Sequence, residues 1–489
     1  MPARAIMIMG TGSDVGKSLI SAGLCRLYAN RGLRVTPFKP QNMSNNAAVT
    51  ADGGEIGRAQ ALQARAARVE TSVHMNPVLL KPESGTGAQV IVQGKRTGSV
   101  SAREFFECRH RYLPAILQSF HRLAAGSDLI IVEGAGSPAE TNLRRGDLAN
   151  MGFAEAADLP AILVGDIHRG GVIASIVGTF RVLSESDASR LKGFIINRFQ
   201  GDPSLFREGV SDIEQATGTP CFGVVPHLAS AARLPAEDSV ALEGEKNVGG
   251  GSIKIAVMRL PRIANFDDFD PLKLEPGVQL TFVAPGEPVP ADAKVVVIPG
   301  SKSTIADLSA LRKDGWAIDI AAHARRGGAV LGLCGGYQML GKAVHDPQGL
   351  EGSPGSAEGL GLLDVETTLL GDKTLTRVEG VHVATGAPIS GYEMHLGETR
   401  GPDCARPFAA IGSRKDGAMS PTRRIMGTYL HGCFAADAFR SAFLEGIGAS
   451  PGKIGFEATV EESLDELASD LGRHLDIDRI LALAVPTKA

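Results

Sequence analysis

The chain has 489 residues, of which 43% are hydrophobic and 21% charged, with a net charge of -4 and a pI near 6.3. These values fit a soluble globular protein of two or three domains and exclude the basic surface that nucleic acid binding requires. No apolar run approaches the roughly 18 residues of a membrane span, and we expect a cytoplasmic protein with neither signal peptide nor membrane contact. The six cysteines lack C-x-x-C pairs, which argues against disulfides and zinc: Cys25, Cys108, Cys221, Cys334, Cys404 and Cys433.

A phosphate-binding loop is predicted near the start of the chain. Residues 5–9 read as a buried strand, residues 10–18 as a glycine-rich loop ending in Gly16-Lys17-Ser18, and the next residues as a helix. Backbone N–H groups at Gly12 and Gly16 would cradle phosphates, Lys17 would reach the terminal phosphates, and the Ser18 hydroxyl would bind Mg²⁺. The alternative is an ordinary turn with a surface lysine.

The loop has five residues between Gly10 and Gly16, one more than the standard motif. This spacing resembles the dethiobiotin synthetase-like branch of P-loop enzymes, which implies that ATP activates a carboxylate. Glu133 ends a second buried strand, where a metal-binding carboxylate is expected to lie. Asp52 is the other candidate metal ligand, and a turn-forming aspartate is an equal alternative.

Two further polar residues follow predicted strands of the same sheet. Lys39 comes directly after residues 34–38, at the strand end where ligands bind in open α/β sheets. It could neutralise a substrate carboxylate or an acyl phosphate, or be a surface lysine. Asn197 follows residues 193–196, and in the dethiobiotin synthetase-like fold this asparagine resembles an adenine-contacting residue.

The predicted domains are divided by composition. At least five βα units precede residue 235, including strands at 161–164 and 220–226, so residues 1–235 are predicted to form a mainly parallel sheet with helices on both faces. Residues 236–252 are rich in charge and glycine and are predicted to be a linker.

The second domain, residues 253–445, is predicted to repeat the doubly wound α/β pattern, with strands at 253–258 and 294–298. Its central feature is residues 329–340, where an apolar strand stops at Cys334 and a helix begins after Gly335-Gly336. This is the outline of a nucleophile elbow, in which the helix start favours the thiolate. The alternative is a buried structural cysteine.

A nucleophilic cysteine needs an oxyanion hole and a base. The backbone N–H groups of Gly335 and of the Gly300-Ser301 loop could stabilise an oxyanion. His431 follows a short strand-like run 97 residues after Cys334 and is the candidate general base. The alternative for a single histidine is packing or surface exposure.

These residues resemble the class I glutamine amidotransferase domain, in which a cysteine hydrolyses glutamine and releases ammonia. That class carries a glutamate two residues after its histidine, but here the position is Cys433. His431 is therefore expected to lack an orienting carboxylate, as in the branch that comprises cobyric acid synthases and cobyrinate diamide synthases.

Taken together, the two domains resemble the cobyric acid synthase family over almost the whole chain. The matching stretches are residues 39–46, 52–60, 133–140, 166–171 and 391–395. The resemblance implies that ATP, Mg²⁺ and L-glutamine are used to amidate four peripheral carboxylates of adenosylcobyrinic acid a,c-diamide, giving cobyric acid in cobalamin biosynthesis. It places Asp147 near the acceptor, although a turn or helix cap is as easy an explanation. His168 departs from the family's expected aspartate.

Two alternative functions are also compatible with these residues. The nearest alternative is cobyrinic acid a,c-diamide synthase, and the more distant one is a non-enzymatic switch ATPase of the partition type. Residues 446–489 show helical periodicity and are predicted to pack against the second domain. The oligomeric state is left open.

Overall fold

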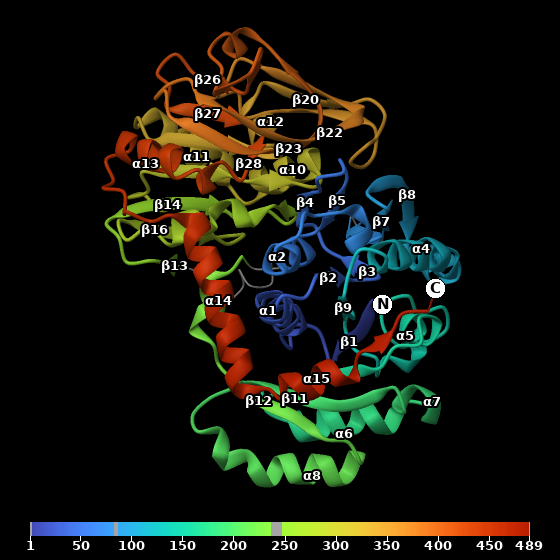
Figure 1. Cartoon of the computed structure of the whole chain (residues 1–489). Helices are drawn as coiled ribbons and strands as arrows, with labels where there is room; N and C mark the ends of the chain where they lie inside the picture. Colours follow the sequence, from blue (N-terminus) through green and yellow to red (C-terminus); the bar gives the residue numbers. More distant parts are fainter. Residues whose placement is uncertain (1, 83–86, 236–246, 489) are drawn as a thin grey trace.

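The computed structural model describes residues 2–82, 87–235 and 247–488. Two parallel β-sheets, each covered by helices, lie in separate halves of the molecule (Figure 1). The predicted fold class, two doubly wound mainly parallel domains, is confirmed. In the described part of the chain, no helix carries an apolar stretch long enough to cross a bilayer.

The first domain is built on six parallel strands in the order β12-β11-β10-β1-β9-β2. Alternate residues of β1 enter two hydrophobic cores, Ile6 and Ile8 on one face and Met7 and Met9 on the other. This two-sided burial explains why the strands read as continuous apolar runs. The strands are β1 (Arg4–Gly10), β2 (Val35–Phe38), β9 (Leu129–Glu133), β10 (Ala161–Asp166), β11 (Leu191–Phe199) and β12 (Cys221–Pro226).

Helices cover both faces of this sheet, and a smaller β region lies beside it. The helices are α1 (Lys17–Asn30), α2 (Arg58–Ala66), α3 (Ala102–Cys108), α4 (Leu113–Ala124), α5 (Met151–Ala156), α6 (Val172–Val182), α7 (Glu185–Ala188) and α8 (Arg207–Thr217). The smaller strands are β3 (Gln41–Met43), β4 (Ala47–Val49), β5 (Glu55–Gly57), β6 (Val78–Pro82), β7 (Gly87–Val92) and β8 (Lys95–Ser101). Helix α2 follows the β4–β5 hairpin and lies next to the second domain (Figure 1).

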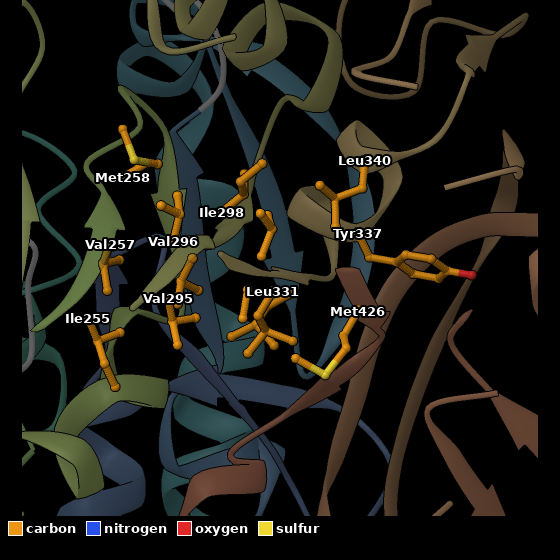
Figure 2. Close-up of a cluster of buried hydrophobic side chains, with 14 of the residues drawn as sticks. Ile255, Val257, Met258, Val295, Val296, Ile298, Leu331, Tyr337, Leu340 and Met426 are labelled. Atoms are coloured by element: carbon orange, nitrogen blue, oxygen red, sulfur yellow. The ribbon is translucent and has the colours of Figure 1, made fainter. Parts of the chain in front are cut away.

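The second domain has a central sheet in the order β13-β16-β14-β17-β19-β27-β26, whose five inner strands are parallel. Figure 2 shows side chains of its core, among them Val257, Val296 and Leu331 from neighbouring strands and Tyr337 from α12. The strands are β13 (Asn247–Val248), β14 (Ile253–Met258), β16 (Val278–Val283), β17 (Val295–Ile298), β19 (Ala329–Leu333), β26 (Ala418–Met419) and β27 (Ile425–Thr428).

A second sheet in this domain was not anticipated from the sequence. It is mainly antiparallel and is dominated by a long hairpin of two strands, β22 and β23. Its strands are β20 (Ala343–Asp346), β21 (Gly355–Glu358), β22 (Glu366–His382), β23 (Pro388–Arg400), β24 (Ala409–Ile411), β25 (Arg414–Asp416) and β28 (Leu430–His431). The pairing of β28 with β23 brings His431 opposite Tyr392.

The remaining elements of the domain are short helices and one small pair of strands. The helices are α9 (Asp270–Lys273), α10 (Thr304–Lys313), α11 (Trp316–Arg325), α12 (Gly335–Leu340) and α13 (Asp437–Gly446). The strands β15 (Ile263–Ala264) and β18 (Gly300–Ser301) pair with each other near the start of α10.

The predicted linker is only partly described. Residues 236–246 lie outside the described residues. Strand β13 pairs with β16, so the end of the segment predicted as a linker belongs to the central sheet of the second domain.

The prediction for the C-terminal residues is wrong in its packing. Helix α14 (Phe456–His474) crosses from the second domain to the first and packs along α1, and β29 (Val485–Pro486) pairs with β1 (Figure 1). Leu467 and Leu471 are fully buried in the first domain's core, and each such burial contributes about 1.5–3 kcal/mol. Helix α15 (Ile477–Leu483) continues along the same domain. Helical periodicity identified an apolar face but could not identify the surface that covers it.

Candidate functional site

The phosphate-binding loop has the expected strand, loop and helix context. Gly16 adopts a left-handed conformation with φ of 95°, directly before α1 begins at Lys17. The Asn197 side chain supports this loop, because its Nδ2 donates to the Val15 carbonyl over 2.9 Å. A side chain at Gly16 would collide with Asn197, since an added Cβ would lie 2.1 Å from Nδ2. Asn197 therefore braces the loop, and its predicted adenine contact stays a prediction.

Four predicted residues of this domain meet at the end of β9. Ser18 Oγ donates to Glu133 Oε1 over 2.9 Å, and Lys39 Nζ donates to the same oxygen over 2.7 Å. Both Lys39 and Glu133 are buried. Lys17 Nζ bonds the carbonyls of Gly12 and Gly136, at 2.6 and 3.1 Å. Two cations, a hydroxyl and a carboxylate thus converge beside the loop, an arrangement suited to holding phosphate groups and a hard metal ion.

The hydrogen bonds of Asp52 join it to a different set of residues from the four that meet at the end of β9. Its carboxylate accepts from the Ser72 hydroxyl over 2.8 Å and from the Val73 N–H over 3.2 Å. Burial opposes ionisation here, but these hydrogen bonds, with others from Thr50 and the backbone, lower the Asp52 pKa. The carboxylate is therefore a local turn organiser, and its role as a metal ligand stays a prediction.

Asp147 and His168 also have structural partners. Asp147 caps the start of α5, accepting from the backbone N–H groups of Ala149, Asn150 and Gly152 over 2.9–3.2 Å. The helix-cap alternative accounts for this residue, and its predicted acceptor contact stays a prediction. His168 is exposed, and its Nδ1 contacts Gln200 over 3.0 Å.

Cys334 occupies the strained turn that the sequence predicted. It connects β19 to α12 with φ of 51° and ψ of -109°, a conformation that L-residues rarely adopt. The glycine after Gly335 is required by close packing, because a Cβ at Gly336 would lie 1.9 Å from the Ile298 carbonyl oxygen. The turn directs the Cys334 sulfur towards β23, where it lies 3.5 Å from the Met394 carbonyl.

His431 has an orienting carboxylate, so the expectation that it lacks one is wrong. His431 Nδ1 lies 2.7 Å from Asp268 Oδ2, and both side chains are almost fully buried. Asp268 Oδ1 also accepts from the Gly432 N–H over 2.6 Å. Asp268 lies in a turn between β15 and α9, 163 residues before His431 in the chain, and no sequence periodicity marks it.

The His431 imidazole also lies close enough to the Cys334 side chain for the two to interact electrostatically. Since Nδ1 is held by Asp268, Nε2 is the ring nitrogen left available to the sulfur. Burial alone would lower the His431 pKa, but the Asp268 carboxylate and Cys334 outweigh it and raise the pKa to about 10. His431 is therefore protonated at neutral pH, and its imidazolium places a positive charge beside the Cys334 sulfur.

A pocket surrounds this constellation and includes both predicted oxyanion-hole positions. Its wall carries Gly300 and Gly335 together with Cys334 and His431. An added Cβ at Gly300 would lie 3.1 Å from His431 Cε1, and one at Gly335 would lie 3.0 Å from the Ser301 nitrogen. Gly300 therefore lets backbone approach His431 closely, and Gly335 lets the turn after Cys334 pack against the Gly300-Ser301 loop. Their role as oxyanion donors stays a prediction.

The pocket also contains residues that sequence reasoning did not assign. Asn45 and Lys81 reach it from the first domain, so the two domains share one pocket. His395 from β23 lines it too, with its ring stacked on Tyr429 at 3.7 Å between centroids. Burial lowers the His395 pKa to about 4, so this ring is neutral at physiological pH. The family resemblance at residues 391–395 includes His395 but assigns no role to it.

Two family models match the chain in the order of its domains. Residues 6–241 match a CobQ/CobB/MinD/ParA nucleotide binding domain, and residues 254–439 match a CobB/CobQ-like glutamine amidotransferase domain. A solved structure of the MinD cell division protein of Aquifex aeolicus covers 47% of this chain and 84% of its own, with 14% identity and a TM-score of 0.28.

Curated relatives match over nearly the full length. The chain is 60% identical to a cobyric acid synthase of Cereibacter sphaeroides, covering 98% of this chain and 99% of the relative. It is 60% identical to one of Rhizobium johnstonii over 97% of each chain, and 59% identical to one of Methylorubrum populi over 99% of each. The chain belongs to the cobyric acid synthase family.

Proposed function

We propose that this protein is a glutamine-hydrolysing cobyric acid synthase, which uses ATP to amidate carboxylates of a corrin. The acceptor that the family implies is adenosylcobyrinic acid a,c-diamide, with four peripheral carboxylates converted to amides. The observation that carries the proposal is the pairing, in one chain, of a buried Cys334, His431 and Asp268 constellation with a phosphate-binding loop beside Lys39 and Glu133.

In the glutaminase half, the Cys334 thiolate attacks the carboxamide carbon of glutamine. The protonated His431 donates its proton to the departing nitrogen, so that ammonia leaves and a glutamyl thioester remains. Water, deprotonated by the now neutral imidazole, hydrolyses the thioester and releases glutamate. Asp268 keeps Nδ1 engaged throughout, and the backbone N–H groups of Gly300 and Gly335 would stabilise the oxyanion.

In the synthetase half, the loop and Lys17 would hold the phosphates of ATP while a carboxylate of the acceptor attacks the γ-phosphate. Lys39 would balance the charge of the resulting acyl phosphate, and ammonia would displace phosphate to form the amide. The short contact between the Ser18 hydroxyl and the Glu133 carboxylate suits Mg²⁺, which prefers such oxygen ligands. When bound there, Mg²⁺ would neutralise charge on the phosphates.

The test is mass spectrometry of the corrin product made from adenosylcobyrinic acid a,c-diamide, ATP and ¹⁵N-amide glutamine. We expect four labelled amides per corrin. A product with no added amide would overturn the proposal. Conversion of cobyrinic acid itself to its a,c-diamide, without reaction of the diamide, would assign the alternative diamide synthase activity.

A further inference from the structure

A contact between the two domains lies directly behind His431. Arg58 is the first residue of α2 in the first domain, and its guanidinium forms an ion pair with Asp267 of the second domain. Arg58 Nη2 also donates to the Tyr392 hydroxyl over 3.2 Å. Both arginine and aspartate are largely removed from solvent, with 18% and 7% of their side chains exposed.

The two partners of Arg58 lie at or next to the groups that hold His431 in place. Asp267 is the chain neighbour of Asp268, which accepts the hydrogen bond from His431 Nδ1. Tyr392 pairs with His431 across β23 and β28, and its ring stacks on the imidazole with centroids 5.5 Å apart. One side chain from the first domain therefore contacts Tyr392, which stacks on the imidazole, and Asp267, the chain neighbour of the carboxylate that bonds it.

The charges at this contact connect it to the position of His431 as well as to the stability of the interface. Asp267 and Asp268 are consecutive buried carboxylates, and Arg58 neutralises the first. Without the guanidinium, Asp267 would be a buried uncompensated charge, which forces a local rearrangement. Any such rearrangement moves Asp268, because the two residues share a short turn. The position of His431 thus depends on Arg58.

The same helix reaches the nucleotide site. Gln63, in the next turn of α2, donates through Nε2 to Glu133, the carboxylate that also bonds Ser18 and Lys39. Helix α2 consequently contacts Asp267 and Tyr392 through its first residue and, about one and a half turns later, Glu133, the candidate Mg²⁺ ligand. One helix therefore links the glutaminase pocket and the nucleotide site through direct side-chain contacts.

We propose that Arg58 is a positioning residue for glutamine hydrolysis, supplied by the synthetase domain and acting through Asp268 and Tyr392. Resting on the function proposed above, it makes full glutaminase activity conditional on docking of α2 against the second domain. Misplacement of a catalytic group by about 1 Å can cost about 10²-fold in rate, and this is the size of effect expected when Arg58 is lost.

The test compares R58M and R58K with R65M, a matched substitution on the same helix. Arg65 bonds Glu457 and Glu461 of α14 and does not touch the glutaminase pocket. We expect R58M to lower the glutaminase kcat by about 10²-fold with a smaller change in the KM for glutamine. R58K, which keeps the charge, should be intermediate, and R65M should match the wild type. Circular dichroism and thermal unfolding check that each variant is folded.

A second readout separates positioning from general damage. Synthesis driven by ammonium salts bypasses Cys334, so R58M should lose far less of it than of glutamine hydrolysis. Removing the uncompensated carboxylate in the double variant R58M/D267N should recover about 10-fold of the lost kcat, the size of coupling expected for contacting groups.

The inference is overturned if folded R58M hydrolyses glutamine at the wild-type kcat, or if it loses both activities equally. These outcomes differ from a failure of the proposed function, in which the wild-type protein itself would show no glutamine hydrolysis. A drop confined to KM would also contradict a role in positioning His431.

Discussion

The two parallel sheets of this protein each end in a reactive loop, but the loops are completed in different ways. In the first domain, Gly16 takes the left-handed conformation and the functional side chains Lys17 and Ser18 follow at once on α1. In the second domain, the proposed nucleophile Cys334 itself occupies the strained position, and its proposed partners come from a different sheet and a distant turn. The nucleotide loop is thus mostly a local structure, whereas the glutaminase constellation exists only in the folded chain.

The largest expected effect comes from removing the nucleophile. C334A should lower glutamine hydrolysis by at least about 10³-fold, because no other group forms the thioester. Synthesis driven by ammonium salts should persist, since the first domain is unchanged. Ammonia release from glutamine is measured in parallel with corrin amidation, and continued glutamine-dependent synthesis by C334A would disprove the role of the sulfur.

Loss of Lys17 should have the opposite effect, because amidation should fall while glutamine hydrolysis is retained. K17M removes the cation that the loop holds next to Gly12 and Gly136, and removal of a group of this kind typically costs about 10²–10³-fold. Amidation should fall with either glutamine or ammonium salts as the nitrogen source. Glutamine hydrolysis measured without ATP should be retained, and amidation at the wild-type rate would contradict the assignment of the loop.

A substitution at Asp268 tests the contact with His431 that only the tertiary structure provides. D268N removes the charge that raises the His431 pKa to about 10, so burial should dominate and lower that pKa. The imidazolium present in the wild type up to about pH 10 should then be lost at lower pH, and kcat should fall by about 10²-fold or more.

The measurement is the pH profile of glutaminase kcat together with NMR titration of a ¹⁵N-labelled imidazole. The alkaline limb should move to lower pH in D268N. An unchanged profile would mean that Asp268 does not set the protonation of His431. K17M serves as the control, because it alters the other domain and should leave the profile in place.

The smallest effect on catalysis is expected from the C-terminal helix. Leu471 of α14 is fully buried against α1 of the first domain, so L471A should reduce the free energy of unfolding by about 2–5 kcal/mol. Glutaminase kcat measured below the unfolding transition should match the wild type. S469A, an exposed change on the same helix, is the control for thermal unfolding, and equal midpoints for the two variants would contradict this packing.

Much of the fold was predictable because its signals are local. The apolar strands of both parallel sheets, the loop before Lys17 and the turn at Cys334 each occupy a few consecutive residues with strong conformational preferences. The antiparallel sheet around β22 and β23 gave a weaker signal, since its residues are less uniformly buried and its pairing depends on long-range register.

The candidate site residues also differ in how well the sequence predicted their contacts. Lys17 and Ser18 were predicted from the glycine-rich loop, and Glu133 and Lys39 from their places at strand ends. The structure brings the four together. Asp52 was predicted from its loop position and Asp147 from the family resemblance, but their hydrogen bonds organise a turn and a helix start. A loop carboxylate has the same sequence signal whether it binds a ligand or the backbone, so sequence could not separate these cases.

The sequence by itself determined the two reactive loops, because glycine placement and apolar runs act over a few residues. Tertiary structure alone decided that Asp268 bonds His431, that Arg58 pairs with the neighbouring Asp267, and that α14 covers the first domain. Each of these depends on contacts between segments far apart in the chain. A charge or an apolar face shows that a partner is needed, and only the packed fold selects which partner it is.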